Sequence, residues 1–377
     1  MQITGGTVLF THDGLQPADL HLQNGLIQTG TTTTGPRLDA TGLLVLPGIV
    51  DLHGDAFERQ LQPRPGVDFP ASLALQDTES QLLANGITTA FHGVTLSWEP
   101  GLRSKTAWRA LLDALAAGTW TCDMRVHLRW EAYNLDALEI ALADIEAGRV
   151  HLLAFNDHTD SILRKLHDPV EGAKYAGRAG MKMADFKALA GETAARSHAV
   201  PAALDQIAAA ARAKNLPMAS HDDDTIEARN RFRGLGAQIC EFPMAEQVGA
   251  AALEAGDFVA MGCPNVVRGG SHLGWASAAR LAESGICRVL TSDYYYPAMI
   301  RAAFILAERG KLTLPQAWSL ISENPAQAAG LTDRGIVAPG KRADLVVVDP
   351  ATHRPVATIA AGKLAYITAA GAQRLTA

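Results

Sequence analysis

The chain has 377 residues, of which 48% are hydrophobic and 19% charged, a composition typical of a globular enzyme with a large core. Its formal net charge of -6 leaves no general basic surface, which argues against nucleic acid as a partner. The length accommodates one large α/β barrel with a small accessory domain, or two ordinary domains.

Residues 1–46 alternate short β-like runs with turns, as in QITGGTVLF and DLHLQNGLIQTG, whose Asn-Gly pair is typical of a tight hairpin. Residues 335–377 repeat this pattern with PGKRADLVVVDP and PVATIAAGKLAYITAAG. We therefore predict that both ends of the chain form one composite, sandwich-like β-domain.

The sequence shows neither a signal peptide, nor a membrane-spanning segment, nor a disulfide pattern. The amino-terminal MQITGGTVLF lacks the basic and apolar regions of a signal peptide, and no run of about 18 apolar residues occurs. We expect a cytoplasmic protein without a membrane partner. The four cysteines are widely spaced, which predicts reduced core residues in place of disulfides or a zinc knuckle.

In the stretch VLPGIVDLHGDAFERQLQPR, residues 45–64, an apolar run typical of a buried strand is followed by charged side chains. His53 and Asp55 stand two residues apart, so in an extended chain they point to the same face. Imidazole and carboxylate are ligands for zinc, manganese or iron. The alternative is a local hydrogen-bonded pair at a strand end.

This stretch resembles the first-strand signature of the amidohydrolase superfamily, Pro-Gly, two hydrophobic residues, then Asp-x-His-x-His, with Asp55 in place of the second histidine. The longer run DLHGDAFERQLQPRPGV is similar to the phosphonate-metabolism branch, the ribose methylphosphonate triphosphate diphosphatases. GIVAPGKRADLVVVD, residues 335–349, resembles a carboxyl-terminal segment of the same superfamily.

The middle of the chain, residues 47–334, alternates apolar runs with Ala- and Leu-rich amphipathic segments. This pattern predicts a (β/α)8 barrel. A doubly wound open sheet is the alternative, although no Gly-x-Gly-x-x-Gly follows a strand. The eight expected strands span residues 48–53, 87–94, 124–131, 150–158, 217–223, 238–244, 258–264 and 287–293.

The connection at 160–200 is the longest in the expected barrel. It is polar and rich in Gly and Ala, and we expect it on the catalytic face as a lid. A solvated helical insertion is the alternative. After FNDHT the diphosphatases usually continue Pro-Gly-Gln-Arg-Gln, whereas this chain continues DSILR.

Metal-capable side chains gather at the ends of the expected strands. In a barrel these ends meet on one face, where the side chains together predict a divalent-cation site. Each one alone could be a structural cap. The candidate ligands are His53, Asp55, Glu131, Asp157, His158, His221, Asp222, Glu241 and Asp293.

The resemblance implies roles for several of these residues. Asp293, in Leu-Thr-Ser-Asp-Tyr, matches the strand-eight aspartate that contacts metal and accepts the proton of the attacking water. Our hypothesis is that one ion is held by His53, Asp55, Glu131 and Asp293, and a second by Glu131, His158 and His221.

The bridging ligand and the number of ions are left open. Glu131 is the first choice of bridge, Asp157 the second and a carboxylated lysine the third. The usual strand-six histidine is missing, because QICEFPM offers only Glu241. A single ion is the alternative to two, with zinc expected and manganese or iron possible.

Guanidinium groups near this centre predict a phosphorylated small-molecule substrate, because they bind phosphate oxygens by paired hydrogen bonds. HLRWE and PNVVRGGSH both resemble segments of the diphosphatase branch. Salt bridges to nearby carboxylates are the alternative role for each arginine. The candidate substrate-binding residues are Arg59, Arg64, Arg129, Arg268 and His272.

The leading hypothesis is a metal-dependent hydrolase similar to the enzymes that convert α-D-ribose 1-methylphosphonate 5-triphosphate to the 5-phosphate and pyrophosphate. A hydrolase of a C–N bond in an N-acyl or cyclic amide is the second hypothesis. A catalytically silent binding protein on the same barrel is the third. A homodimer is possible, although the sequence shows no interface.

Overall fold

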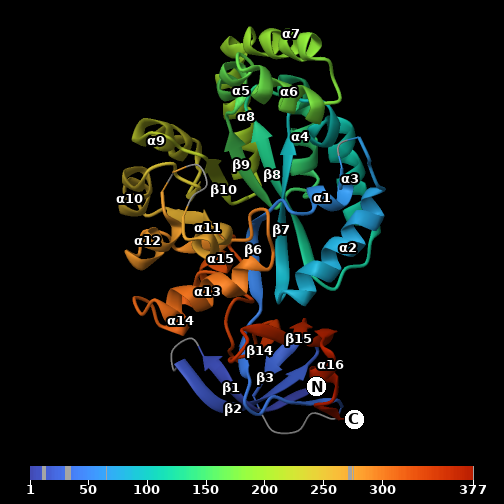
Figure 1. Ribbon diagram of the computed structural model, residues 1–377, viewed down its shortest axis with the longest axis vertical. Helices are drawn as coiled ribbons and strands as arrows, with labels where there is room; N and C mark the ends of the chain where they lie inside the picture. The colour runs from blue at the N-terminus through green and yellow to red at the C-terminus, as the bar shows by residue number, and fades with distance from the viewer. Residues whose placement is uncertain (11–13, 30–34, 65, 271–273, 275, 377) are drawn as a thin grey trace.

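The computed structural model describes residues 1–10, 14–29, 35–64, 66–270, 274 and 276–376. It contains a large helix-covered barrel and a smaller sheet, and the smaller sheet carries both termini at one end of the molecule (Figure 1). Nothing in those ranges provides a helix long and apolar enough to cross a bilayer.

Eight parallel strands in the described ranges form the barrel in sequence order. The first and last strands meet through a parallel bridge between Gly54 and Asp293, which brings the sheet round on itself. The predicted (β/α)8 barrel is therefore confirmed. Its strands are β6 Ile49–Gly54, β7 Ile87–Leu96, β8 Asp123–Glu131, β9 Leu152–Asn156, β10 Met218–His221, β11 Ile239–Glu241, β12 Phe258–Gly262 and β13 Val289–Thr291.

Strand β8 shows how the alternation of side chains builds both layers. Val126, Leu128 and Trp130 belong to the hydrophobic core under the surrounding helices. The intervening His127 and Arg129 contact residues across the barrel, at Leu52 of β6 and at His221 of β10. One strand therefore supplies outer core residues and inner polar residues in strict alternation.

Helices follow the strands and cover the barrel (Figure 1). Hydroxyl side chains cap several of them, including Ser104 before α3, Thr225 before α9 and Thr313 before α14. The covering helices are α2 Ala71–Ala84, α3 Lys105–Ala117, α4 Leu138–Glu146, α8 Val200–Ala213, α9 Ile226–Leu235, α10 Glu246–Glu254, α11 Cys263–Arg268, α12 Ala278–Glu283, α13 Ala298–Glu308, α14 Leu314–Ser319 and α15 Glu323–Ala328; the one-turn α1 spans Glu58–Leu61.

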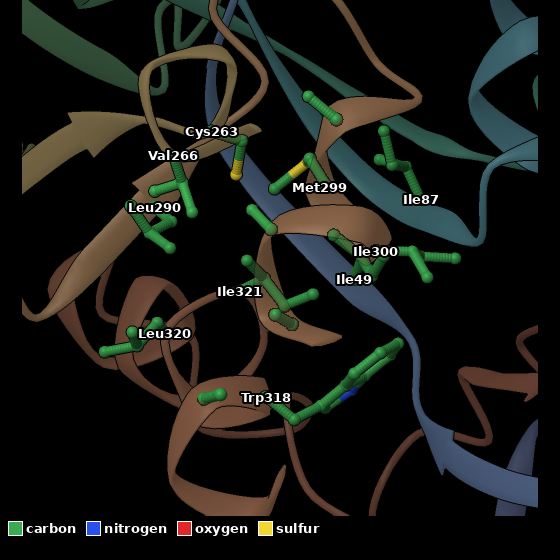
Figure 2. Close-up of a cluster of buried hydrophobic side chains, with 14 of the residues drawn as sticks. Ile49, Ile87, Cys263, Val266, Leu290, Met299, Ile300, Trp318, Leu320 and Ile321 are labelled. Atoms are coloured by element: carbon green, nitrogen blue, oxygen red, sulfur yellow. The ribbon is translucent and has the colours of Figure 1, made fainter. Parts of the chain in front are cut away.

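One large core cluster joins the first barrel strand to the last helices (Figure 2). Ile49 of β6 and Ile321 are both fully buried in it. Trp318 of α14 packs there and donates its indole N–H to the carbonyl of Pro47 at 3.0 Å. The four cysteines are buried and free, as the sequence predicts.

The long fourth connection folds as three helices beyond the carboxyl ends of β8 and β9 (Figure 1): α5 Thr159–Lys165, α6 Pro169–Arg178 and α7 Met183–Ala194. They bury a small core of their own, which includes Ile162, Phe186 and Ala190, and Trp98 packs against it. Helix α6 begins at Pro169, with Asp168 capping its first turn. We refer to residues 159–194 as the helical insertion.

The smaller sheet combines strands from both ends of the chain. In it β5 pairs antiparallel with β14, and the β2–β3 hairpin turns through Asn24 and Gly25, both with positive φ, as the Asn-Gly pair predicts. Its strands are β1 Gln2–Phe10, β2 Gly14–Gln23, β3 Leu26–Gln28, β4 Arg37–Asp39, β5 Leu44–Pro47, β14 Leu345–Asp349, β15 Arg354–Ala360, β16 Lys363–Ile367 and β17 Leu375–Thr376, with the short helix α16 Ala369–Ala372.

Candidate metal centre

Metal-capable side chains meet at the carboxyl ends of the barrel strands. Two groups each bring three ligand atoms within 4.8 Å of one another. The first contains His53, His221 and Glu241; the second contains His158, His221 and Asp222. His221, at the end of β10, belongs to both, so the two groups are neighbours.

The backbone turns sharply where three of the strands end. Asp222, Phe242 and Asp293 follow β10, β11 and β13 and have φ values of 57°, 54° and 55°. Each donates its backbone N–H to a carbonyl of another strand, at Glu241, Ala260 and His53 respectively. Left-handed backbone costs about 1–2 kcal/mol per non-glycine residue, which these bonds offset while fixing each turn.

Asp293 needs open space beside it. A Cβ on Gly262 would lie 2.9 Å from its carboxylate, so the glycine at the end of β12 leaves room for this side chain. Burial raises the pKa of Asp293 to about 7, and the charge on Asp55 adds to this shift. Its carboxylate lines the central cavity.

Glu241 lies at the centre of the first group and is fully buried. Its Oε2 is 3.1 Å from Nδ1 of His53 and 3.8 Å from Nε2 of His127. Burial lowers the pKa of both imidazoles to about 3, so they are neutral and able to bind metal. Among the described residues, Glu241 Oε1 and His127 Nε2 have no hydrogen-bond partner, as expected where a cation belongs.

His127 was not among the residues predicted from the sequence to bind metal or substrate. Its signal was present in HLRWE, where residues 127, 129 and 131 share one face of the strand. His127 sits four residues before the strand ends, and its Nδ1 lies 2.9 Å from the carbonyl oxygen of Leu52. It extends the polar layer deeper into the barrel than the strand ends do.

Glu131 lies behind His158. Its Oε1 accepts the backbone N–H of His158 at 3.0 Å, and its Oε2 is 3.3 Å from Nδ1 of the same residue. The other ring nitrogen is 3.5 Å from Asp222. Burial alone would lower the pKa of His158, but Asp222 and Glu131 raise it to about 9. Glu131 thus contacts one histidine from behind and does not join either ligand group.

Arg129 is an internal cation of the centre. It is 7% exposed, with its guanidinium 3.1 Å from Nε2 of His221 and 3.6 Å from the carboxylate of Asp55. A guanidinium only donates, so Nε2 of His221 accepts. Burial lowers the pKa of His221 to about 4, which keeps this nitrogen unprotonated.

A cavity of about 230 Å³ opens over the cluster. Arg268 reaches it from α11, and its guanidinium donates to the Tyr294 hydroxyl at 3.2 Å. Arg59 lies 6.0 Å from the Tyr294 ring centre but is not among the lining residues. The lining combines His53, Asp55, Arg129, His221, Asp222, Phe242, Pro243, Met261, Gly262, Asn265, Arg268, Gly270, Ala276, Asp293 and Tyr294.

Asp157 and Arg64 are candidates that do not line this cavity. Asp157 lies 3.6 Å from Arg231 and does not line the cavity. Arg64 is exposed in the turn that follows α1 and also lies outside the lining. His272 falls outside the described residues.

The model of the amidohydrolase family matches residues 72–372. The chain belongs to the amidohydrolase family. The resemblance seen in the sequence is confirmed, and the chain is a member of a family of hydrolases.

Two curated relatives match most of this chain. The chain is 33% identical over 339 residues to the alpha-D-ribose 1-methylphosphonate 5-triphosphate diphosphatase of Escherichia coli, covering 87% of this chain and 90% of that protein. It is 27% identical to an adenine deaminase of Methylobacterium nodulans, covering 86% of this chain and 50% of that protein.

Two solved structures share the fold of this chain. Dihydropyrimidinase from Brevibacillus agri matches with a TM-score of 0.60 and 14% identity, over 96% of this chain and 94% of its own. N-acetylglucosamine-6-phosphate deacetylase from Pasteurella multocida matches with a TM-score of 0.64 and 11% identity, over 96% and 98%. At these identities the similarity establishes the architecture.

Proposed function

We propose that this amidohydrolase is a metal-dependent diphosphatase that hydrolyses a small molecule bearing a triphosphate and releases pyrophosphate. The observation that carries the proposal is a cavity lined by Arg129 and Arg268 together with three candidate metal ligands, His53, His221 and Asp222. The nearly full-length similarity to the diphosphatase of Escherichia coli supports the same substrate class.

The residues fit a divalent cation. His53, His221 and Glu241 would hold one ion, and His158, His221 and Asp222 would hold a second. Imidazole and carboxylate donors suit zinc, and manganese or iron fits the same donors. His158, whose pKa is about 9 in the metal-free protein, would release its proton on binding an ion. An ion bound there supplies Lewis-acid stabilisation of negative charge on a phosphoryl oxygen. The sequence made Glu131 the first choice of bridge between two ions. We propose instead that Glu131 orients His158.

Asp293 is the proposed proton acceptor. Its carboxylate lines the same cavity as His53, His221 and Asp222, and burial raises its pKa in the metal-free protein, which makes it a better proton acceptor. In this role it takes the proton from the water that attacks phosphorus. It then returns a proton as the product departs.

The arginines are proposed to bind the polyphosphate. Arg268 lies at the mouth and is held by the Tyr294 hydroxyl, while Arg129 lies deeper, between Asp55 and His221. In this role Arg129 would contact the reacting phosphoryl group and Arg268 a phosphate farther along the chain.

The test begins with metal content of the purified protein and proceeds to assays of the metal-reconstituted enzyme. Ribose and nucleoside triphosphates are compared with N-acyl and cyclic amides. We expect pyrophosphate release that is lost on chelation and in Asp293→Asn. Arg268→Met should raise KM about tenfold or more, whereas Arg280→Met, at an exposed pair with Glu246, should not. Amide turnover without pyrophosphate release would overturn the proposal in favour of C–N hydrolysis.

A further inference from the structure

A continuous path of contacts leads from the helical insertion to the metal centre. The ring of Phe186, in α7, lies 5.7 Å from the ring of Trp98, centroid to centroid. The indole N–H of Trp98 donates to the hydroxyl of Thr159 at 3.0 Å, and this hydroxyl donates to Oε1 of Glu131 at 3.1 Å. Glu131 in turn contacts Nδ1 of His158.

The direction of each bond is fixed by chemistry. The Trp98 indole can only donate, so the Thr159 hydroxyl accepts from it and must give its single proton to Glu131. Thr159 is fully buried and Glu131 is 2% exposed, so a broken bond leaves a polar atom without water. The carboxylate of Glu131 is therefore held in one orientation.

A second contact joins the helical insertion to the segment after β7 that carries Trp98. Arg178, at the end of α6, lies 2.5 Å from the carboxylate of Glu99, which is 4% exposed and follows Trp98 in sequence. Both α6 and α7 thus contact the short segment after β7 that carries Trp98. A shift of the insertion would move the indole that anchors the path.

We propose that Trp98 and Thr159 are positioning residues that fix the imidazole of His158 through Glu131, and that helix α7 sets this arrangement through Phe186. The inference rests on the proposed function, in which His158 holds an ion. A carboxylate hydrogen-bonded behind a metal-binding histidine orients the ring and strengthens the ligand, and losing it weakens metal binding roughly 10- to 100-fold.

Two pairs of variants separate positioning from simple packing. Thr159→Val keeps the shape of the side chain and removes the hydroxyl, whereas Thr159→Ser keeps the hydroxyl. Trp98→Phe keeps an aromatic ring beside Phe186 and removes the N–H. Thr193→Val, at a threonine of α7 that is 7% exposed and lies outside the path, is the matched control.

The readout is the dissociation constant for Zn²⁺, measured by competition with a chromophoric chelator, with urea unfolding of each metal-free variant. We expect Thr159→Val and Trp98→Phe to weaken binding of one ion by roughly 10-fold or more, with kcat lowered and KM retained. Thr159→Ser and Thr193→Val should bind as the wild type does.

Equal Zn²⁺ affinity in Thr159→Val, Thr159→Ser and the wild type would overturn the inference while leaving the proposed function intact. A wild-type protein that binds no divalent ion would instead overturn the proposed function. If Thr159→Val does not fold, Trp98→Phe decides: unchanged affinity in that variant rejects the positioning role, and weakened affinity supports it.

Discussion

The guanidinium of Arg129 lies 3.1 Å from Nε2 of His221. This nitrogen accepts the hydrogen bond, so its lone pair is already engaged by a cation that the protein itself supplies. Asp55, 3.6 Å away, balances the charge of the guanidinium. An ion that uses the same lone pair must displace Arg129.

Replacing Arg129 therefore alters metal binding and substrate binding in opposite directions. We expect Arg129→Gln to lower the dissociation constant for Zn²⁺ about tenfold, because a charged hydrogen bond worth about 1.5 kcal/mol no longer competes for His221. KM for the triphosphate should rise. Arg129→Lys keeps a cation and should change metal affinity less. Weaker metal binding in Arg129→Gln would show that Arg129 supports the ligands.

The two buried glutamates differ in their expected effect on metal content. Glu241→Gln should lose an ion, because it removes a carboxylate that lies among the ligand atoms. Glu131→Gln should keep the metal-to-protein ratio at saturating metal and show reduced affinity, because Glu131 contacts His158 from behind. Elemental analysis after equilibrium dialysis measures both. Loss of both ions in Glu131→Gln would restore its role as the bridge.

His92 makes the metal-free protein sensitive to acid. It is 1% exposed, its ring packs edge-on against Phe57 at 5.1 Å, and burial lowers its pKa from 6.5 to about 4. Below pH 6.5 the unfolded chain binds a proton at this site that the folded protein does not, so stability falls as pH falls towards 4.

Substituting His92→Leu should make this loss shallower by about 1.4 kcal/mol per pH unit, the slope of one proton. The measurement is urea unfolding of the metal-free variant and wild type at several pH values between 6.5 and 4. Other buried histidines keep part of the acid sensitivity in the variant. Identical slopes in the two proteins would contradict the prediction.

A buried ion network supports β10 and β11. Arg229 is 1% exposed and lies 3.3 Å from Asp223 and 3.4 Å from Asp257. Arg229→Met should destabilise the protein by about 3–5 kcal/mol, because the buried carboxylate of Asp223 loses its arginine and that of Asp257 keeps only Arg233. Arg280→Met, which breaks an exposed pair with Glu246, should cost about 1 kcal/mol or less. Equal losses in urea unfolding would contradict this reasoning.

The barrel could be predicted because its signal is local. Each expected strand is an apolar run set between amphipathic segments, and all eight form where they were expected. The ends were harder to place: QICEFPM yields only the short β11, because Phe242 turns to a left-handed conformation. Backbone reversal at a strand end depends on the neighbouring strand that accepts its N–H.

The partners of the site residues could not be predicted in the same way. Asp157 and His158 are adjacent in sequence, yet one lies beside Arg231 and the other between Glu131 and Asp222. Glu241 was a secondary candidate, but contacts with His53 and His127 from other strands place it at the centre. The contacts between carboxylate oxygens and imidazole nitrogens join residues from different strands, so they depend on how the barrel closes.

The antiparallel pairing of β5 with β14 has a consequence for biosynthesis. The whole barrel is encoded between these two strands, and a ribosome needs on the order of tens of seconds to translate that length. During this time β5 lacks its neighbour and offers a bare hydrogen-bonding edge to other nascent chains. Expression at a lower temperature or with a chaperone that shields strand edges should therefore raise the yield of native protein.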